Sequence, residues 1–334
     1  MSPLSSRGYI ERWHPRALPH LYFGMTPNNA IHYINMARHD NKHIAFKASD
    51  GFELDGLLLP RDSGSEVELL NTPIVIIVHG ELGHFLSNVT PRLLPSYLFD
   101  KGISSFAINT RMANIGQKTG QAIVDDAIMD IEASVDLLKD IGFQRIYILG
   151  YSLGSNLAVY YASERPDPAV RGIILEGCTY SLPDSHKKRL NKWGSIPSYD
   201  DIYEKAKEIL SPDPYTSLND TILVVSRAWG PTLKPGHFGI FTYRTWWFMK
   251  GPEATKTKAY KLISKVKMPI LFIRGANDRL IENRETIKLA DIANKAGNFD
   301  VTIKYIPDAR HDCMENPGST TQEIVGWISS VNSP

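Results

Sequence analysis

Apolar and polar residues along the chain follow two different periods, and the switch between them predicts the elements. Short continuous apolar runs, such as residues 74–78, are typical of strands buried on both faces of a sheet. A longer stretch, residues 121–141, repeats apolar side chains every three to four positions, which predicts an amphipathic helix. From about residue 43 onward the two kinds of segment alternate. Such alternation indicates βα units around a mostly parallel sheet.

The predicted elements divide the chain into an extension, a split core and an insertion. Strands are predicted at 43–48, 52–59, 74–78, 103–108, 145–149, 171–175, 268–273 and 301–306, and helices at 91–101, 121–141, 155–164, 282–296 and 320–331. The alternation of strands and helices stops between residues 178 and 262. This stretch is rich in Pro, Gly and Trp and is too long for a structureless loop. We expect a core of residues 43–177 and 263–334, with 178–262 inserted as a helical or irregular cap. Residues 1–42 are rich in aromatic residues, so we expect this extension to pack on the body or the cap.

Composition narrows the class of protein without naming its chemistry. Of 334 residues, 43% are hydrophobic and 22% are charged, as in a folded soluble protein. The net charge is +1 with no long basic block, which argues against a nucleic-acid partner. No apolar run approaches the roughly 18 residues of a membrane span, and Arg7, Arg12 and Arg16 interrupt the start of the chain, so we expect a cytoplasmic protein without a membrane partner. Two cysteines, Cys178 and Cys313, make no disulfide framework, and no residue spacing suggests a metal or a cofactor. The sequence gives no oligomeric state.

The strongest chemical signal is Gly150-Tyr151-Ser152-Leu153-Gly154, a Gly-x-Ser-x-Gly pattern between a predicted strand and a predicted helix. Small residues suit a turn this sharp, which can hold a serine oxygen above the end of the sheet. Alone, the pattern is equally consistent with an ordinary Gly-rich strand-to-helix turn. A His79-Gly80 turn after an early strand, and an Asp and then a His after later strands, change that balance.

With these features the chain resembles the α/β-hydrolase fold superfamily, and in particular its carboxylesterase-like serine hydrolases. The resemblance covers about residue 43 to the end, without the insertion. It implies a mostly parallel central sheet flanked by helices, with a cap inserted after the sixth strand. It also implies a catalytic triad in the order Ser152, Asp278, His311, each at the carboxyl end of a strand.

The three roles have competing interpretations. Asp278 could be a turn or helix-capping aspartate, because Asn-Asp is good turn chemistry. Glu176, at the end of another strand, is a rival acid, and Asp312 is less suited because side chains of neighbouring residues diverge from His311. An unperturbed histidine titrates near ~6.5, so an imidazole can take the serine proton at neutral pH, while the acid orients it.

The segment His79-Gly80-Glu81-Leu82-Gly83-His84 resembles the oxyanion loop of the family. The backbone N–H groups of Leu153 and Glu81 are then the expected oxyanion hole. A carboxylate at Glu81 would repel a developing oxyanion unless it points away, is paired or is protonated. We favour a solvated loop glutamate, with the positioning of water or of a polar substrate group as the alternative. His79 is expected to anchor this loop.

Four tryptophans lie in the insertion: Trp193, Trp229, Trp246 and Trp247. A cap with such side chains above the nucleophile would form an apolar pocket for a small molecule. The plainer interpretation is that each belongs to the cap's own core or to a subunit contact.

Together these features predict a serine hydrolase acting on a small or medium carboxylic ester with an apolar portion. A thioesterase, lactonase, amidase or carbon–carbon bond hydrolase would use the same residues, because the fold does not choose the bond. A binding protein on a hydrolase scaffold is the alternative from another class, and an intact triad argues against it. The expected partner is a small-molecule substrate.

Overall fold

The computed structural model describes residues 42–61, 72–113, 122–226 and 238–331. The extension expected at 1–42 lies outside these residues, apart from Lys42 at the start of the first strand. Within the described residues no helix is long and apolar enough to cross a membrane. Both cysteines are buried and free.

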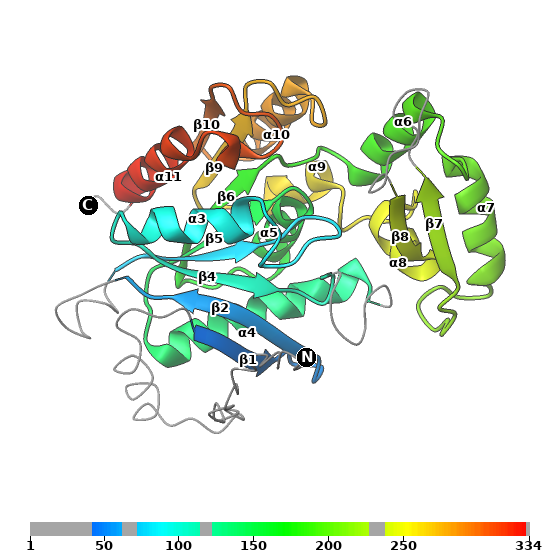
Figure 1. Ribbon diagram of the computed structural model, residues 1–334, viewed down its shortest axis with the longest axis horizontal. Coiled ribbons are helices and arrows are strands. Elements are labelled where there is room, and N and C mark those ends of the chain that lie inside the picture. Colours follow the sequence, from blue (N-terminus) through cyan, green and yellow to red (C-terminus); the bar gives the residue numbers. More distant parts are fainter. Residues whose placement is uncertain (1–41, 62–71, 114–121, 227–237, 332–334) are drawn as a thin grey trace, which may run out of the picture.

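In this part of the chain, eight strands form one sheet in the order β1-β2-β4-β3-β5-β6-β9-β10 (Figure 1). Their bounds are β1 (Lys42–Lys47), β2 (Glu53–Leu59), β3 (Ile74–Val78), β4 (Ser104–Asn109), β5 (Ile146–Tyr151), β6 (Val170–Glu176), β9 (Ile270–Gly275) and β10 (Val301–Ile306). The pairs β1–β2 and β2–β4 are antiparallel, and every other pair is parallel. Each predicted strand is confirmed to within two residues at either end.

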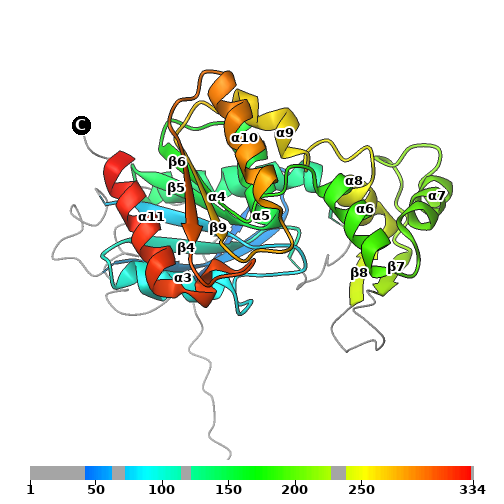
Figure 2. The ribbon, with the colours of Figure 1, turned by 90° about the horizontal axis from the view of Figure 1, so that it is seen from above.

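Helices cover both faces of this sheet, which is why its strands are apolar on both sides (Figure 2). Along β3, Val75 and Ile77 face the core under α3 (Thr90–Phe99) and α11 (Pro317–Val331), whereas Ile76 faces the opposite core. That second core is covered by α4 (Ala127–Ile141), α5 (Leu153–Glu164) and α10 (Asn283–Lys295). The predicted helices are present, but α4 begins later than expected because a 3-10 turn, Val124–Asp126, precedes it.

The residues between β6 and β9 form a smaller unit beside the sheet (Figure 1). It contains α6 (Leu182–Trp193), α7 (Tyr199–Ile209), β7 (Ile222–Ser226), β8 (Phe238–Thr242) and α8 (Tyr243–Lys250), after which α9 (Ala259–Leu262) packs against α5. The expectation of a helical or irregular insertion was incomplete, because β7 and β8 pair as an antiparallel hairpin. Strands β6 and β9, on either side of the insertion in sequence, pair directly, so one sheet carries both flanks.

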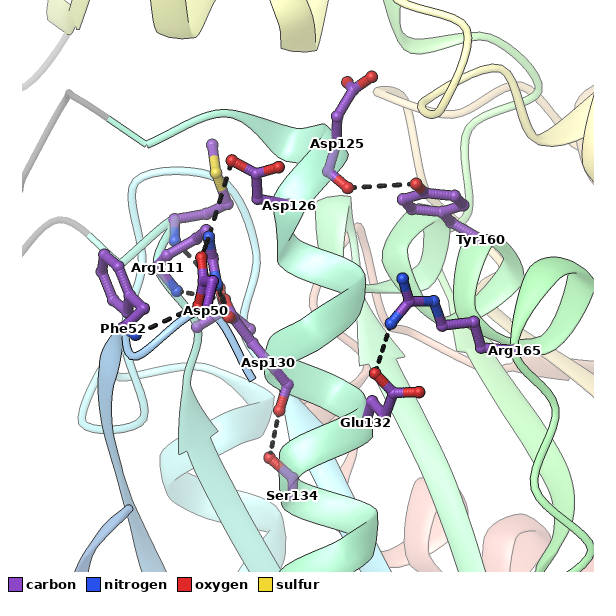
Figure 3. A network of polar contacts seen from close by, with 12 residues as sticks. Asp50, Phe52, Arg111, Asp125, Asp126, Asp130, Glu132, Ser134, Tyr160 and Arg165 are labelled. Atoms are coloured by element: carbon purple, nitrogen blue, oxygen red, sulfur yellow. Dashed lines mark hydrogen bonds and ion pairs between the residues drawn. The ribbon is translucent and has the colours of Figure 1, made fainter. Parts of the chain in front are cut away.

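A buried ionic network fixes the carboxyl end of β4 (Figure 3). The Arg111 backbone N–H donates to Asp130 Oδ2 on α4 (2.7 Å), and its guanidinium donates to Asp130 Oδ1 (2.9 Å) and to Asp50 in the β1–β2 turn (2.8 Å). Burial raises the pKa of Asp130 to about 6 despite this guanidinium. The network therefore connects the β1–β2 hairpin, the end of β4 and α4. The neighbouring Thr110 donates its backbone N–H to His79 Nε2.

Candidate active site

The turn after β5 holds Ser152 in a conformation that few residues adopt. Ser152 has φ 53° and ψ −115°, between the last residue of β5 and the first of α5. A Cβ added at Gly154 would lie 2.8 Å from the His79 carbonyl oxygen, and one at Gly150 would collide with Gly154. Both glycines are needed because the strand, the turn and the helix approach so closely. Such strain is typical of functional positions.

The structure brings Ser152, His311 and Asp278 together from three strand ends. Ser152 Oγ lies 3.0 Å from His311 Nε2, and His311 Nδ1 lies 3.0 Å from Asp278 Oδ2. Since a carboxylate accepts, the Nδ1–H group donates to Asp278, which leaves Nε2 to accept from the serine hydroxyl. The side chain of Asp278 is fully buried, whereas that of His311 remains 15% exposed.

Asp278 is held as a carboxylate by its surroundings. Burial pushes its pKa upward, but the hydrogen bond with His311 outweighs it together with backbone donors, so the pKa stays below the ordinary value. Those donors are the N–H groups of Leu280 (2.7 Å) and Ile281 (3.1 Å), both bonded to Oδ1. One oxygen is thus anchored to the backbone while the other receives the imidazole. The sequence allowed Asp278 to be a turn aspartate instead of a partner of the histidine. In the structure Asp278 makes both the turn hydrogen bonds and the contact to His311.

The rival acid, Glu176, has a different environment. Its Oε1 accepts from the Thr90 hydroxyl (2.8 Å) and the Cys313 N–H (2.9 Å), and its Oε2 is buried with no hydrogen-bond partner among the described residues. Burial, with a smaller contribution from Asp312, raises the pKa of Glu176 to about 8. Glu176 thus contacts the loop that carries His311 through Cys313 and makes no hydrogen bond with the imidazole in the described structure.

The turn after β3 lies against Ser152. A Cβ on Gly80 would be 3.0 Å from the Tyr151 ring and 3.3 Å from Ser152 Cβ. His79 is fully buried, with Nδ1 2.8 Å from the Gly80 carbonyl oxygen and Nε2 3.0 Å from the Thr110 hydroxyl. Burial lowers the pKa of His79 to about 4, so it is a neutral anchor for this turn.

The two expected oxyanion donors belong to this neighbourhood. Leu153 is the first residue of α5, and the first N–H groups of a helix have no acceptor within the helix. Glu81 is next to Gly80 in a turn in which the Gly83 N–H donates to the Gly80 carbonyl oxygen (3.2 Å). Both backbone N–H groups thus belong to segments that adjoin Ser152.

The side chain of Glu81 is paired, so the expectation of a solvated loop glutamate was wrong. Its Oε1 forms an ion pair with Lys250 Nζ, at the end of α8 in the insertion. The Lys250 side chain is fully buried and that of Glu81 is 16% exposed. The sequence offered no signal for this partner, because the two residues are 169 positions apart.

A cleft of about 1490 Å³ opens between the insertion and the core, bordered by Tyr151 and His311. Its walls come from α6, the start of α10 and the loops after β9 and β10. Seven lysine and arginine side chains and six aspartate and glutamate side chains line it, compared with two tyrosines and one tryptophan. The cleft therefore differs from the aromatic pocket expected from composition.

The tryptophans of the insertion have separate positions. Trp193 lines the cleft. Trp246 is fully buried, 5.2 Å from the Tyr199 ring, and Trp247 stacks on Tyr203 at 5.5 Å. Neither is among the cleft residues, so these two belong to the core of the insertion, as the plainer interpretation held. Trp229 lies outside the described residues.

The described residues contain no group of three or more His, Cys, Asp or Glu side chains arranged to hold a metal ion.

Comparison with known sequences gives two findings. A family model for the alpha/beta hydrolase fold matches residues 73–208. The 2-succinyl-6-hydroxy-2,4-cyclohexadiene-1-carboxylate synthase of Serratia proteamaculans is 32% identical over 76 residues, which are 22% of this chain and 30% of that protein. The match thus spans less than a third of the length of this relative.

Several solved structures match a larger share of the chain than this sequence relative does. The Pyrococcus furiosus esterase Pf2001 superposes with a TM-score of 0.59 at 17% identity, covering 93% of this chain and 96% of the esterase. Est1E from Butyrivibrio proteoclasticus gives 0.55 at 16% identity, with 85% and 99% covered. A monoacylglycerol lipase of Paleococcus ferrophilus gives 0.54 at 19% identity, with 79% and 97% covered. At these identities the likeness concerns the fold.

Proposed function

We propose that the chain is a serine hydrolase of the α/β-hydrolase superfamily that cleaves a carboxylic ester through an acyl-enzyme. The observation that carries the proposal is the hydrogen-bonded chain from Ser152 through His311 to Asp278. Each of its two distances is 3.0 Å, within the range for a nucleophile and its base. The esterases and the lipase among the structural neighbours agree with this chemistry.

Acylation begins at the Ser152 hydroxyl. Its oxygen attacks the ester carbonyl carbon while its proton passes to His311 Nε2. Asp278 stabilises the resulting imidazolium and keeps Nδ1 protonated, so that Nε2 faces the serine. The carbonyl oxygen becomes an anion, which the Leu153 and Glu81 backbone N–H groups receive. When the tetrahedral intermediate collapses, the imidazolium protonates the departing alkoxide, and an alcohol leaves.

Deacylation repeats these steps with water. His311 takes a proton from the water as its oxygen attacks the acyl carbon, and the proton then returns to Ser152. The carboxylic acid is released and the free serine is restored. Each oxyanion donor contributes about 2.7 to 4 kcal/mol to the transition state in well-characterised hydrolases, so two of them account for a large part of the rate.

A small or medium ester remains the proposed substrate, but the lining of the cleft changes the expectation of a purely apolar pocket. Because charged side chains from α6 and α10 line the cleft, the substrate is expected to carry a polar or charged group beside its apolar portion. The same catalytic residues would serve a thioester, a lactone or an amide, so the bond must be settled by experiment.

Turnover of a substrate panel tests this function. Matched p-nitrophenyl esters with neutral and with carboxylate-bearing acyl chains, thioesters and lactones are compared in the wild type, Ser152→Ala and Ser185→Ala. Ser185 lines the cleft from α6 in the insertion, so its variant controls for the loss of a serine hydroxyl in the cleft. We expect ester turnover that falls by about 10³-fold or more only in Ser152→Ala, with thermal unfolding nearly unchanged. Retained turnover in that variant would remove Ser152 from the mechanism.

A further inference from the structure

Lys250 is the one lysine among the buried residues of the described chain. Its ammonium group contacts Glu81, and it lies 4.5 Å from the centre of the Phe241 ring on β8. Three elements of the insertion meet at this residue, because the Tyr199 hydroxyl of α7 donates to the Lys250 carbonyl oxygen (2.7 Å). The insertion thus holds one buried positive charge against the turn beside the nucleophile.

The partner of this charge stands at a sensitive place. Glu81 follows Gly80, whose backbone lies against Ser152. During ester cleavage a negative charge develops where the backbone N–H of Glu81 is proposed to act. A second negative charge on the side chain of the same residue would oppose it, and the repulsion is strong in a partly buried site, where solvent screens poorly. The side-chain carboxylate therefore needs a cation.

We propose that Lys250 is a positioning residue that neutralises Glu81 and holds its carboxylate away from the developing oxyanion. The insertion then supplies a charge to the active site in addition to a wall of the cleft. This inference rests on the proposed function. It also explains how a glutamate can occupy the oxyanion turn, which the sequence alone left unresolved.

The two single substitutions should have unequal effects. In Lys250→Met the carboxylate keeps its charge but is no longer held away from the oxyanion by the lysine, so kcat should fall about tenfold to a hundredfold. In Glu81→Gln the cation stays and the carboxylate is gone, so kcat should fall at least threefold less than it does in Lys250→Met. KM should change less than about threefold in both, because the charge acts on the transition state. An ion pair with only a structural role would give two similar losses.

Three further variants complete the test. Lys250→Arg keeps the positive charge and should preserve kcat, while the double variant Glu81→Gln/Lys250→Met removes both charges and should exceed Lys250→Met in kcat by about tenfold. Lys207→Met, at an exposed site on α7, is the matched control and should behave as the wild type. If Lys250→Met does not fold, Lys250→Gln replaces it, because its amide still donates to Glu81 without charge.

The measurement is steady-state hydrolysis of one p-nitrophenyl ester together with the rate of Ser152 modification by a fluorophosphonate, and the thermal unfolding of every variant. The modification rate should follow the same order as kcat, which makes the test independent of substrate choice. Equal kcat losses in Lys250→Met and Glu81→Gln, or a loss confined to KM, would overturn the inference. A folded wild type that neither turns over esters nor reacts with the fluorophosphonate would instead overturn the proposed function.

Discussion

At the residue scale, the site depends on how a few polar groups are satisfied. Asp278 Oδ1 is fixed by two backbone N–H groups, so its other oxygen is free to orient His311. Glu176 also lies at a strand end, but its Oε1 is bonded to Thr90 and Cys313. These different hydrogen bonds, and not the distance along the sequence, distinguish Asp278, the proposed orienting acid, from Glu176.

Replacing each carboxylate by its amide tests this division. Asp278→Asn should lower kcat by about 10³- to 10⁴-fold, because the amide can hold the imidazole in the wrong tautomer. Glu176→Gln is the control of the same kind and should lower kcat by less than about tenfold. Steady-state ester hydrolysis of both variants gives the comparison. A larger loss in Glu176→Gln would reassign the acid.

The nucleophile, base and acid could be nominated from sequence because each follows a predicted strand in a known order. The partner of Glu81 could not, since Lys250 comes close only after the insertion folds. Trp246 was placed in the pocket by composition, yet its side chain is fully buried. Aromatic content alone does not distinguish the core of a small unit from the wall of a cleft.

At the element scale, the sheet could be predicted because its strands are buried on both faces and read as apolar runs. The hairpin of β7 and β8 could not be. Only alternate residues of β7 are buried, and it lies in a stretch dominated by Pro, Gly and Trp. The cleft also required the structure, because its walls come from helices on both sides of the insertion boundary.

Glu176 connects three parts of the fold. It lies at the end of β6 and accepts hydrogen bonds from Thr90 at the start of α3 and from Cys313 in the loop after β10. Burial raises its pKa to about 8 from an ordinary value of 4.5. Below about pH 4.5 both folded and unfolded chains bind this proton. As the pH rises toward 8 only the folded chain keeps it, so the stability that this group contributes is progressively lost.

Glu176→Gln removes that titration. The free energy of unfolding of the wild type, minus that of the variant, should fall by on the order of 1.4 kcal/mol per pH unit between about pH 4.5 and 8. Urea unfolding of both proteins at pH 5, 6.5 and 8 measures the difference. Parallel pH dependences would show that Glu176 ionises in the folded protein as it does in the unfolded chain.

At the scale of the whole molecule, one sheet brings together residues that an insertion separates in sequence. Because β6 pairs with β9, the loops that carry Ser152, Asp278 and His311 lie together at the carboxyl ends of the parallel strands. The insertion then contributes to the cleft and, through Lys250, contacts Glu81 in the turn beside Ser152. A length of 334 residues by itself is equally consistent with two independent domains.

The most direct measurement is the intact mass of the folded protein after reaction with a fluorophosphonate, which modifies an activated serine. We expect one adduct on the wild type, located by peptide mapping at Ser152 and absent from Ser152→Ala. No adduct on the folded wild type, or the same adduct on Ser152→Ala, would contradict the assignment of Ser152 as the nucleophile.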